Sequence, residues 1–173
     1  LVADALPAAG AARGSLTGAT FHGDHGAQYT SRAYAALCAR LGVGVNLLPM
    51  SDTPVRTVID SADGPLAFQD YFVRRRAEPV VQGIRYEGAT KAPPIAALAS
   101  LLTDPDLAGI FIAPSNPWLS IDPILAIPSL AAALRSTTAP VIAISPIVGG
   151  RALKGPTAKI MGELGVTVSA GAI

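Results

Sequence analysis

Residues 107–125 read LAGIFIAPSNPWLSIDPIL, and this stretch decides the expected fold. Its first part, 107–113, is a short apolar run typical of a buried parallel strand. A polar turn bracketed by prolines, 114–117, follows at once, so we expect it at the carboxyl edge of an α/β sheet, where open sheets bind their ligands. The arrangement recurs downstream, where the apolar run 140–144 precedes the polar loop 145–156. Two such units side by side would build one site.

Strand and helix patterns alternate around these units. We expect strands at 43–48, 80–86, 107–113, 141–144 and 166–168, and helices at 1–13, 32–41, 68–76, 94–102, 129–136 and 157–164. The pair Asp63-Gly64, between the apolar runs 55–59 and 65–68, predicts a hairpin. The alternation predicts the α/β class, with a partial doubly wound, Rossmann-like and mostly parallel sheet.

Composition limits the classes of function. The chain has 173 residues, of which 50% are hydrophobic and 14% charged, which is typical of a globular domain. The net charge of +1 argues against a nucleic-acid partner. The single cysteine, Cys38, fits a small core residue, excludes an internal disulfide and predicts a cytoplasmic location. No apolar run is long enough to span a bilayer, so no membrane partner is expected.

The turn after the first strand carries the first candidate residues, Ser115, Asn116, Pro117 and Ser120. Their hydroxyl, amide and backbone N–H groups could face an anionic ligand at the end of a strand. The same residues are also common in turns and helix caps that bind nothing. Both interpretations remain open from the residues alone.

The second loop carries Gly149, Gly150 and Lys154. Paired glycines let a ligand approach the backbone, and a lysine can hold a phosphate, although a flexible loop with a solvated lysine explains the same residues. The order of residues is not that of a Walker loop. Arg74 and Arg75 follow an aromatic segment and suit a phosphorylated ligand, or else form a solvated face.

The amino-terminal segment carries His22, Asp24 and His25. These three residues suggest a metal site, but no other histidine or cysteine lies close enough in sequence to complete a structural zinc site. The Gly-x-Ser-x-Gly nucleophile pattern does not occur, so Ser-His-Asp catalysis is not supported.

From about residue 42 the chain resembles the 2-phospho-L-lactate transferases of coenzyme F-420 biosynthesis. The matching pieces are LLPMSDTPVRT at 47–57, FQDYFVRR at 68–75, PSNP at 114–117 with SIDPIL at 120–125, and SPI at 145–147 with GG at 149–150 and KGP at 154–156. The resemblance implies transfer of a phospholactyl or enolpyruvyl phosphate group from a GDP-linked donor to the deazaflavin Fo, with release of GMP and with help from Mg²⁺. In this interpretation Ser115, Asn116 and Ser120 lie near the substrate, and Gly149, Gly150 and Lys154 surround phosphate.

Residues 1–41 resemble instead the integrase core of an insertion-sequence transposase, through FHGDHGAQYTS at 21–31 and AALC at 35–38. That family uses three metal-binding carboxylates, and only Asp24 has a counterpart here, so the integrase chemistry is not expected. We therefore expect a transposase remnant, 1–41, joined to the carboxyl half of a transferase domain, 42–173, truncated at both ends, with its magnesium ligands in the absent amino half. The alternatives are an inactive chimeric gene product and a transposase fragment. A homodimer is left open.

Overall fold

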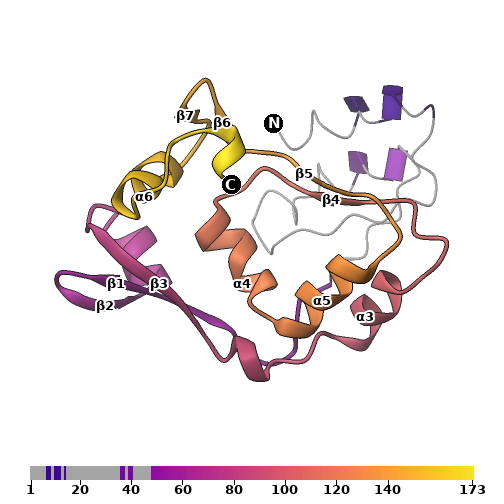
Figure 1. Ribbon diagram of the computed structural model, residues 1–173, viewed down its shortest axis with the longest axis horizontal. Helices are drawn as coiled ribbons and strands as arrows, with labels where there is room; N and C mark the ends of the chain where they lie inside the picture. The colour runs from indigo at the N-terminus through magenta and orange to yellow at the C-terminus, as the bar shows by residue number, and fades with distance from the viewer. Residues whose placement is uncertain (1–6, 9, 13, 15–35, 38, 41–47) are drawn as a thin grey trace. The chain divides into compact units, whose positions relative to one another are not determined.

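The computed structural model describes residues 7–8, 10–12, 14, 36–37, 39–40 and 48–173 (Figure 1). The chain divides into two compact units, Leu1–Pro49 and Met50–Ile173. In the first unit, residues 7–8, 10–12, 36–37 and 39–40 are helical, as expected for 1–13 and 32–41. The integrase-like motif at 21–31, Cys38 and the boundary expected between residues 41 and 42 lie outside the described residues, as does all but the last residue of the strand expected at 43–48.

The second unit begins with a three-stranded antiparallel sheet. It consists of β1 (Arg56–Ser61), β2 (Gly64–Ala67) and β3 (Val81–Glu87), in the order β2-β1-β3. Ser61 pairs with Gly64 at the end of the β1–β2 hairpin, and the Ser61 hydroxyl donates to the Gly64 carbonyl at 2.8 Å. The hairpin predicted from Asp63-Gly64 is confirmed. The segment after β2 is the π-helix η1 (Asp70–Arg74), so the helix expected within 68–76 is confirmed as well.

A parallel strand pair follows. β4 (Ile110–Ile112) pairs in parallel with β5 (Val141–Ala143), and α3 (Ala96–Leu102) precedes them. The connection from β4 to β5 contains η3 (Pro117–Ile121), α4 (Asp122–Leu125) and α5 (Pro128–Ser136). This strand-helix-strand unit confirms the α/β class. In the described residues the parallel pairing covers β4 and β5, and the other strand pairs are antiparallel.

Prolines mark where the helices of this connection begin. Pro117, Pro123 and Pro128 each stand in the first turn of a helix, where the missing N–H costs nothing. Within the described residues, no single helix is both long and apolar enough to cross a membrane. One bent pair, Pro117–Leu125 with Pro128–Ser136 at 84°, meets the length and composition requirement when taken together.

The last part of the unit is a short hairpin and a helix. β6 (Ile147–Val148) pairs antiparallel with β7 (Arg151–Ala152), and α6 (Thr157–Glu163) follows. Two 3₁₀ turns, η2 (Ala89–Lys91) and η4 (Ala170–Ala172), complete the elements described. The strand expected at 166–168 is wrong. The N–H of Val166 bonds to the Met161 carbonyl at 2.7 Å and the N–H of Ser169 to the Thr167 carbonyl at 2.8 Å, so this backbone is engaged locally.

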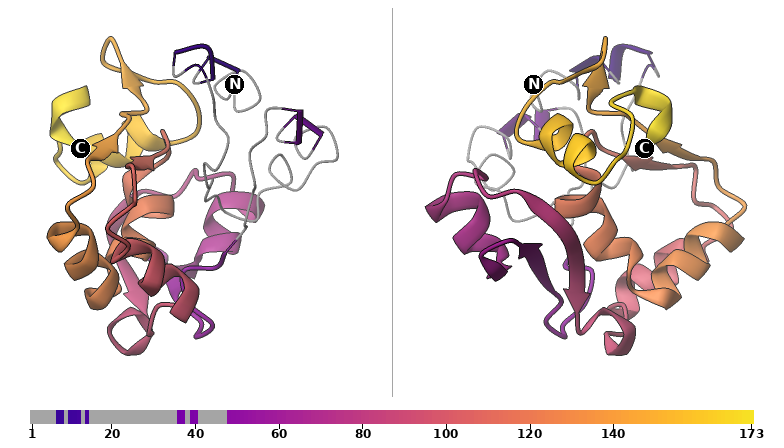
Figure 2. Two further views of the ribbon diagram at one scale, coloured as in Figure 1. Left: turned by 90° about the vertical axis from the view of Figure 1, so that its right-hand side faces the viewer. Right: turned by 60° about the vertical axis from the view of Figure 1, so that its left-hand side comes forward.

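Two apolar clusters hold the second unit together. The first joins η1, β3, η3 and α6 through Tyr71, Val81, Leu119 and Ile160, all buried. The second lies between α3 and α5, which are side by side in Figures 1 and 2, and contains Leu102, Ile127 and Leu130. The segment 113–125 contributes Leu119 to the first cluster, while Ile110 before it and Ile127 after it pack in the second, so the segment is held by both clusters.

Candidate functional site

The carboxyl ends of the two parallel strands lie next to each other. The N–H of Ile144, just after β5, donates to the carbonyl of Ile112 at the end of β4 at 3.1 Å. The loops that start at Ala113 and at Ser145 therefore leave the sheet at the same edge, as the sequence predicted. This edge is where α/β sheets bind ligands.

The loop after β4 is closed by Asn116. Its side-chain oxygen accepts the N–H of Leu119 at 3.0 Å, and its backbone carbonyl accepts the N–H groups of Ser120 at 3.0 Å and Ile121 at 3.3 Å. Pro117 fills the first position of η3. Capping satisfies a backbone donor that the helix itself leaves free. Asn116 therefore has a structural role, and Ser120 lies one turn further along, half-buried within η3.

The other end of the Asn116 amide is unpaired. Its nitrogen, Nδ2, is buried and makes no hydrogen bond to any described residue. A buried donor without an acceptor costs free energy of about 1–3 kcal/mol, so such groups are uncommon and call for an explanation. The two hydrogens of this amide have no acceptor among the described residues. The structure thus gives the Ser115–Ser120 loop a polar group that its own fold does not use.

Tyr86 and Asp122 flank the same turn. The Tyr86 hydroxyl lies 2.7 Å from the backbone carbonyl oxygen of Trp118 and 3.4 Å from Oδ2 of Asp122. Burial raises the pKa of the Asp122 carboxyl above its usual range, and the hydrogen bond with Tyr86 opposes that rise. Burial also raises the pKa of Tyr86, with the nearby carboxylate adding to the effect, so its hydroxyl keeps its proton. Asp122 stood in the motif at 120–125 without a predicted role, and nothing in the sequence pointed to Tyr86.

The second loop forms the tip of the β6–β7 hairpin. Gly149 and Gly150 occupy its turn with φ of +57° and +72°. Two successive positive φ values are the requirement of a two-residue hairpin turn, which explains both glycines without a ligand. Lys154 is exposed in the segment between β7 and α6. The structure leaves a phosphate-binding role of these residues as a prediction.

The two arginines after the aromatic segment are engaged in ion pairs. Arg74 pairs with Asp70 at 3.3 Å, while Arg75 pairs with Asp70 and with Asp63, each at 3.1 Å. These partners lie on η1 and in the β1–β2 turn, so the pairs brace the hairpin against η1. In the structure both arginines satisfy local carboxylates, and a ligand would have to compete for them.

The elements that carry the predicted residues share one apolar core. The elements that carry or flank them, η1, η3 and α6, pack together through Tyr71, Leu119 and Ile160. Between the Ser115–Ser120 loop and Gly149, Gly150, Lys154, Arg74 or Arg75, the part of the chain that the structure describes has no hydrogen bond or ion pair. The candidate site is therefore the Ser115–Ser120 loop with Tyr86 and Asp122.

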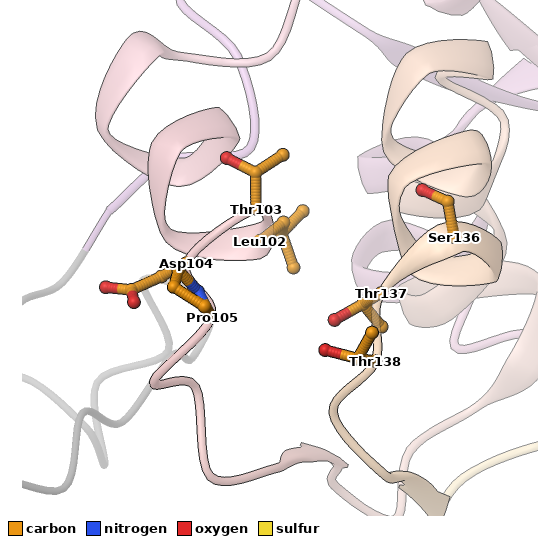
Figure 3. A pocket seen from close by; sticks show the side chains of 7 residues that line it. All are labelled: Leu102, Thr103, Asp104, Pro105, Ser136, Thr137 and Thr138. Atoms are coloured by element: carbon orange, nitrogen blue, oxygen red, sulfur yellow. The ribbon is translucent and has the colours of Figure 1, made fainter.

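A pocket with polar lining residues lies at another edge of the parallel pair. A pocket of about 290 Å³ separates residues 102–105, after α3, from residues 136–138, after α5, and Figure 3 shows the two segments facing each other across it. These segments lead into β4 and β5, so the pocket lies at the amino edge of the parallel pair. The hydroxyls of Thr103, Ser136 and Thr137 are all used in local hydrogen bonds. We do not assign the site to this edge.

The described residues do not fit a magnesium ion. No group of three or more His, Cys, Asp or Glu side chains among them is arranged to hold a metal. At the candidate site the carboxylate is that of Asp122 alone, and Mg²⁺ takes six oxygen ligands in near-octahedral geometry. No step of a mechanism is assigned to a metal here.

The fold and the site define an α/β protein whose polar loops follow the carboxyl ends of parallel strands. The chain belongs to the 2-phospho-L-lactate transferase CofD family, whose family model matches residues 13–173. This match confirms the resemblance found from residue 42 onward. It also extends upstream to residue 13, so it covers most of the segment that resembles an integrase core.

Individual relatives agree with the family. The chain is 37% identical to the 2-phospho-L-lactate transferase of Methanococcoides burtonii over 139 residues, 80% of this chain and 44% of that protein. It is 38% identical to the phosphoenolpyruvate transferase of Mycobacterium leprae over 149 residues, 83% of this chain and 44% of that protein. The solved structure of protein BH3568 from Bacillus halodurans is similar with a TM-score of 0.49 and 16% identity, over 94% of this chain and 49% of that one. The chain thus spans less than half the length of these relatives.

Proposed function

We propose that this chain carries the donor-binding loop of a transferase that moves a phospholactyl or enolpyruvyl phosphate group from a GDP-linked donor to the deazaflavin Fo, releasing GMP. Family membership supports the reaction class. The names of the relatives support both donor types, since some are 2-phospho-L-lactate transferases and others phosphoenolpyruvate transferases. A homodimer and a cytoplasmic location belong to the proposal, and magnesium does so through the resemblance alone, with its ligands outside the described residues.

One observation carries the assignment of the loop. The buried Asn116 amide nitrogen has no acceptor among the described residues, and it lies at the sheet edge where α/β folds bind ligands. A phosphate or carboxylate oxygen of the donor would supply the acceptor. Ser115 and Ser120, both half-buried on the same loop, would add hydroxyl contacts. The attacking hydroxyl belongs to the acceptor, so the protein's part is to position the donor and to stabilise its charge.

The test is a thermal-shift titration of the whole chain with GDP. A ligand that binds only the folded state at 100 times its Kd stabilises it by about 2.7 kcal/mol, which raises Tm by roughly 5–11 °C for a chain of this size. ADP serves as the comparison nucleotide. The absence of any shift at millimolar GDP would overturn the assignment.

The decisive variant is Asn116→Asp. It keeps the side-chain oxygen that caps Leu119 and replaces the amide donor by a carboxylate oxygen, which repels an anion. We expect the GDP shift to disappear, and Tm without ligand to fall as well, because the new oxygen is buried without a donor; the GDP shift is therefore measured against the variant's own Tm without ligand. The control, Thr138→Val, alters the pocket at the opposite edge and should leave the shift intact. An Asn116→Asp protein that still responds to GDP would make Asn116 a purely structural residue.

The alternative proposal is an inactive chimera of a transposase remnant with part of a transferase. It rests on the integrase-like motif at 21–31, and the family match, which starts at residue 13, overlaps the same segment. Sequencing the DNA on both sides of the reading frame separates the two readings. An insertion element upstream, followed further out by a glycine-rich transferase segment, would support the chimera, whereas an uninterrupted transferase gene would exclude it.

A further inference from the structure

The backbone carbonyl of Trp118 has no donor within its own helix. In an α-helix this carbonyl would accept the N–H of Asp122, four residues on. Because η3 is a π-helix, the Asp122 N–H donates instead to the carbonyl of Pro117. The next residue, Pro123, has no N–H at all. Both main-chain donors that the helix could offer to Trp118 are therefore lost.

Tyr86 supplies the missing donor from another part of the chain. Its hydroxyl, at the end of a side chain on β3, lies 2.7 Å from the Trp118 carbonyl and 32 residues away in sequence. The carboxylate of Asp122 is the second acceptor within reach, at 3.4 Å. A phenol has one proton to donate, and the shorter distance makes the Trp118 carbonyl its principal acceptor and Asp122 the weaker one.

We propose that Tyr86 is a positioning residue of the candidate site, whose hydroxyl replaces the absent backbone donor and holds η3 in its π-helical register. Without that hydroxyl, the Trp118 carbonyl is left unpaired unless the Asp122 N–H returns to it and the turn becomes α-helical. That change removes the extra residue of the π turn. It rotates the residues before the turn relative to those after it by about 100°, the angle per residue of an α-helix. The change would alter how Asn116 and Ser120 lie relative to each other.

The identity of the ligand in this inference rests on the proposed function, but the role of the Tyr86 hydroxyl does not. The hydrogen bond and its effect on the loop can be measured without a ligand. Trp118 is the single tryptophan of the chain, so its fluorescence reports on this turn alone. Hydrogen exchange of the amides of Leu119, Ser120 and Ile121 reports on the bonds that Asn116 accepts.

The experiment compares Tyr86→Phe with Tyr71→Phe in the whole chain. The first variant keeps the ring in the second apolar cluster and removes only the hydroxyl. The second removes a hydroxyl that makes a long 3.4 Å bond to the Ala77 carbonyl in the first cluster. We expect Tyr86→Phe to shift the Trp118 emission and to speed exchange of the three amides by about tenfold. Tyr71→Phe should change neither, and Tyr86→Phe should also weaken GDP binding where the parent chain binds GDP.

A rescue variant addresses loss of stability in Tyr86→Phe. Pro123→Ala restores an N–H that, in the π register, points to the Trp118 carbonyl. In that background the effect of Tyr86→Phe on emission and exchange should be clearly smaller. Unchanged emission and exchange in Tyr86→Phe, equal changes in Tyr71→Phe, or a full effect that persists with Pro123→Ala would each overturn the inference. A parent chain that does not bind GDP would defeat the proposed function, while emission and exchange would still decide the role of Tyr86.

Discussion

The carboxylate of Glu163 accepts a hydrogen bond from the backbone N–H of Val81 at 3.0 Å, joining α6 to the start of β3 across 82 residues of sequence. One turn earlier on α6, Lys159 donates to the carbonyl of Pro79 at 2.8 Å and pairs with Glu163 at 2.7 Å. Two side chains on one face of α6 thus satisfy the backbone on both sides of Val80. They fix the helix that follows the Lys154 loop against the core shared with η3.

Replacing Glu163 by alanine should lower the free energy of unfolding by about 1–3 kcal/mol. Val81 is buried, and its N–H would lose its acceptor. Glu163→Gln keeps an acceptor oxygen and loses only the ion pair with Lys159, so we expect a loss below about 1 kcal/mol. Urea denaturation of the two variants checks this. Equal losses would show that the charge, and not the bond to Val81, stabilises the contact.

Because of Asp122, the free energy of unfolding should fall as pH rises. Burial raises its pKa, so the folded state holds the proton more tightly than the unfolded chain does. The resulting stabilisation is complete below the ordinary carboxyl pKa of 3.8 and is lost as pH rises through the raised value. Asp122→Asn should remove this slope and raise Tm at neutral pH. Urea denaturation between about pH 3 and 7 measures it.

Asp60 should have the opposite effect on the pH dependence of stability. Its hydrogen bond with Arg85 lowers the pKa of Asp60, so its contribution is present above the ordinary pKa and is lost as the solution is acidified. In Asp60→Asn the free energy of unfolding should therefore fall less on acidification than it does in the parent chain. Identical pH profiles for the Asp122 and Asp60 variants would contradict both assignments.

Substitutions of the turn residue Gly149 can distinguish the effect of backbone strain from an effect on ligand binding. Its φ is +57°, and a Cβ built there meets no atom within 4 Å. Gly149→Ala should therefore cost about 1 kcal/mol of stability through conformation alone, whereas Gly149→Asn should cost less, because asparagine tolerates this region. Denaturation curves give the stability and GDP titrations the binding. A phosphate-binding turn would lose the GDP response in both variants, and a purely structural turn in neither.

The parallel strand pair carries an apolar surface that parallel sheets usually bury. Phe111 and Ile142 are neighbours across β4 and β5, and they are 60% and 46% exposed. We expect the protein to self-associate through this face and Phe111→Ser to reduce the association. Sedimentation velocity over a range of concentrations measures it. Val73→Ser, at a residue 64% exposed on η1, is the control and should not change the association.

Local patterns predicted most of the elements. Asp63-Gly64 marked the β1–β2 hairpin, and the alternation of apolar runs with helical segments marked the α/β class, because both signals lie within a few neighbouring residues. The strand predicted at 166–168 is wrong because that prediction also rested only on a few neighbouring residues. Its β-branched residues favour a strand, but the N–H of Val166 was already taken by the end of α6.

The sequence by itself determined the family, the α/β class and the polar loop from Ser115 to Ser120, because short motifs and apolar runs of neighbouring residues indicate each of them. Only the tertiary structure decided that the Asn116 amide nitrogen is buried without an acceptor, and that Arg74 and Arg75 are held by Asp70 and Asp63. It also decided that Tyr86 replaces the donor missing at Trp118. The contacts of Tyr86 with Trp118 and of Arg75 with Asp63 depend on how segments apart in sequence pack together, and no local pattern of residues encodes that packing.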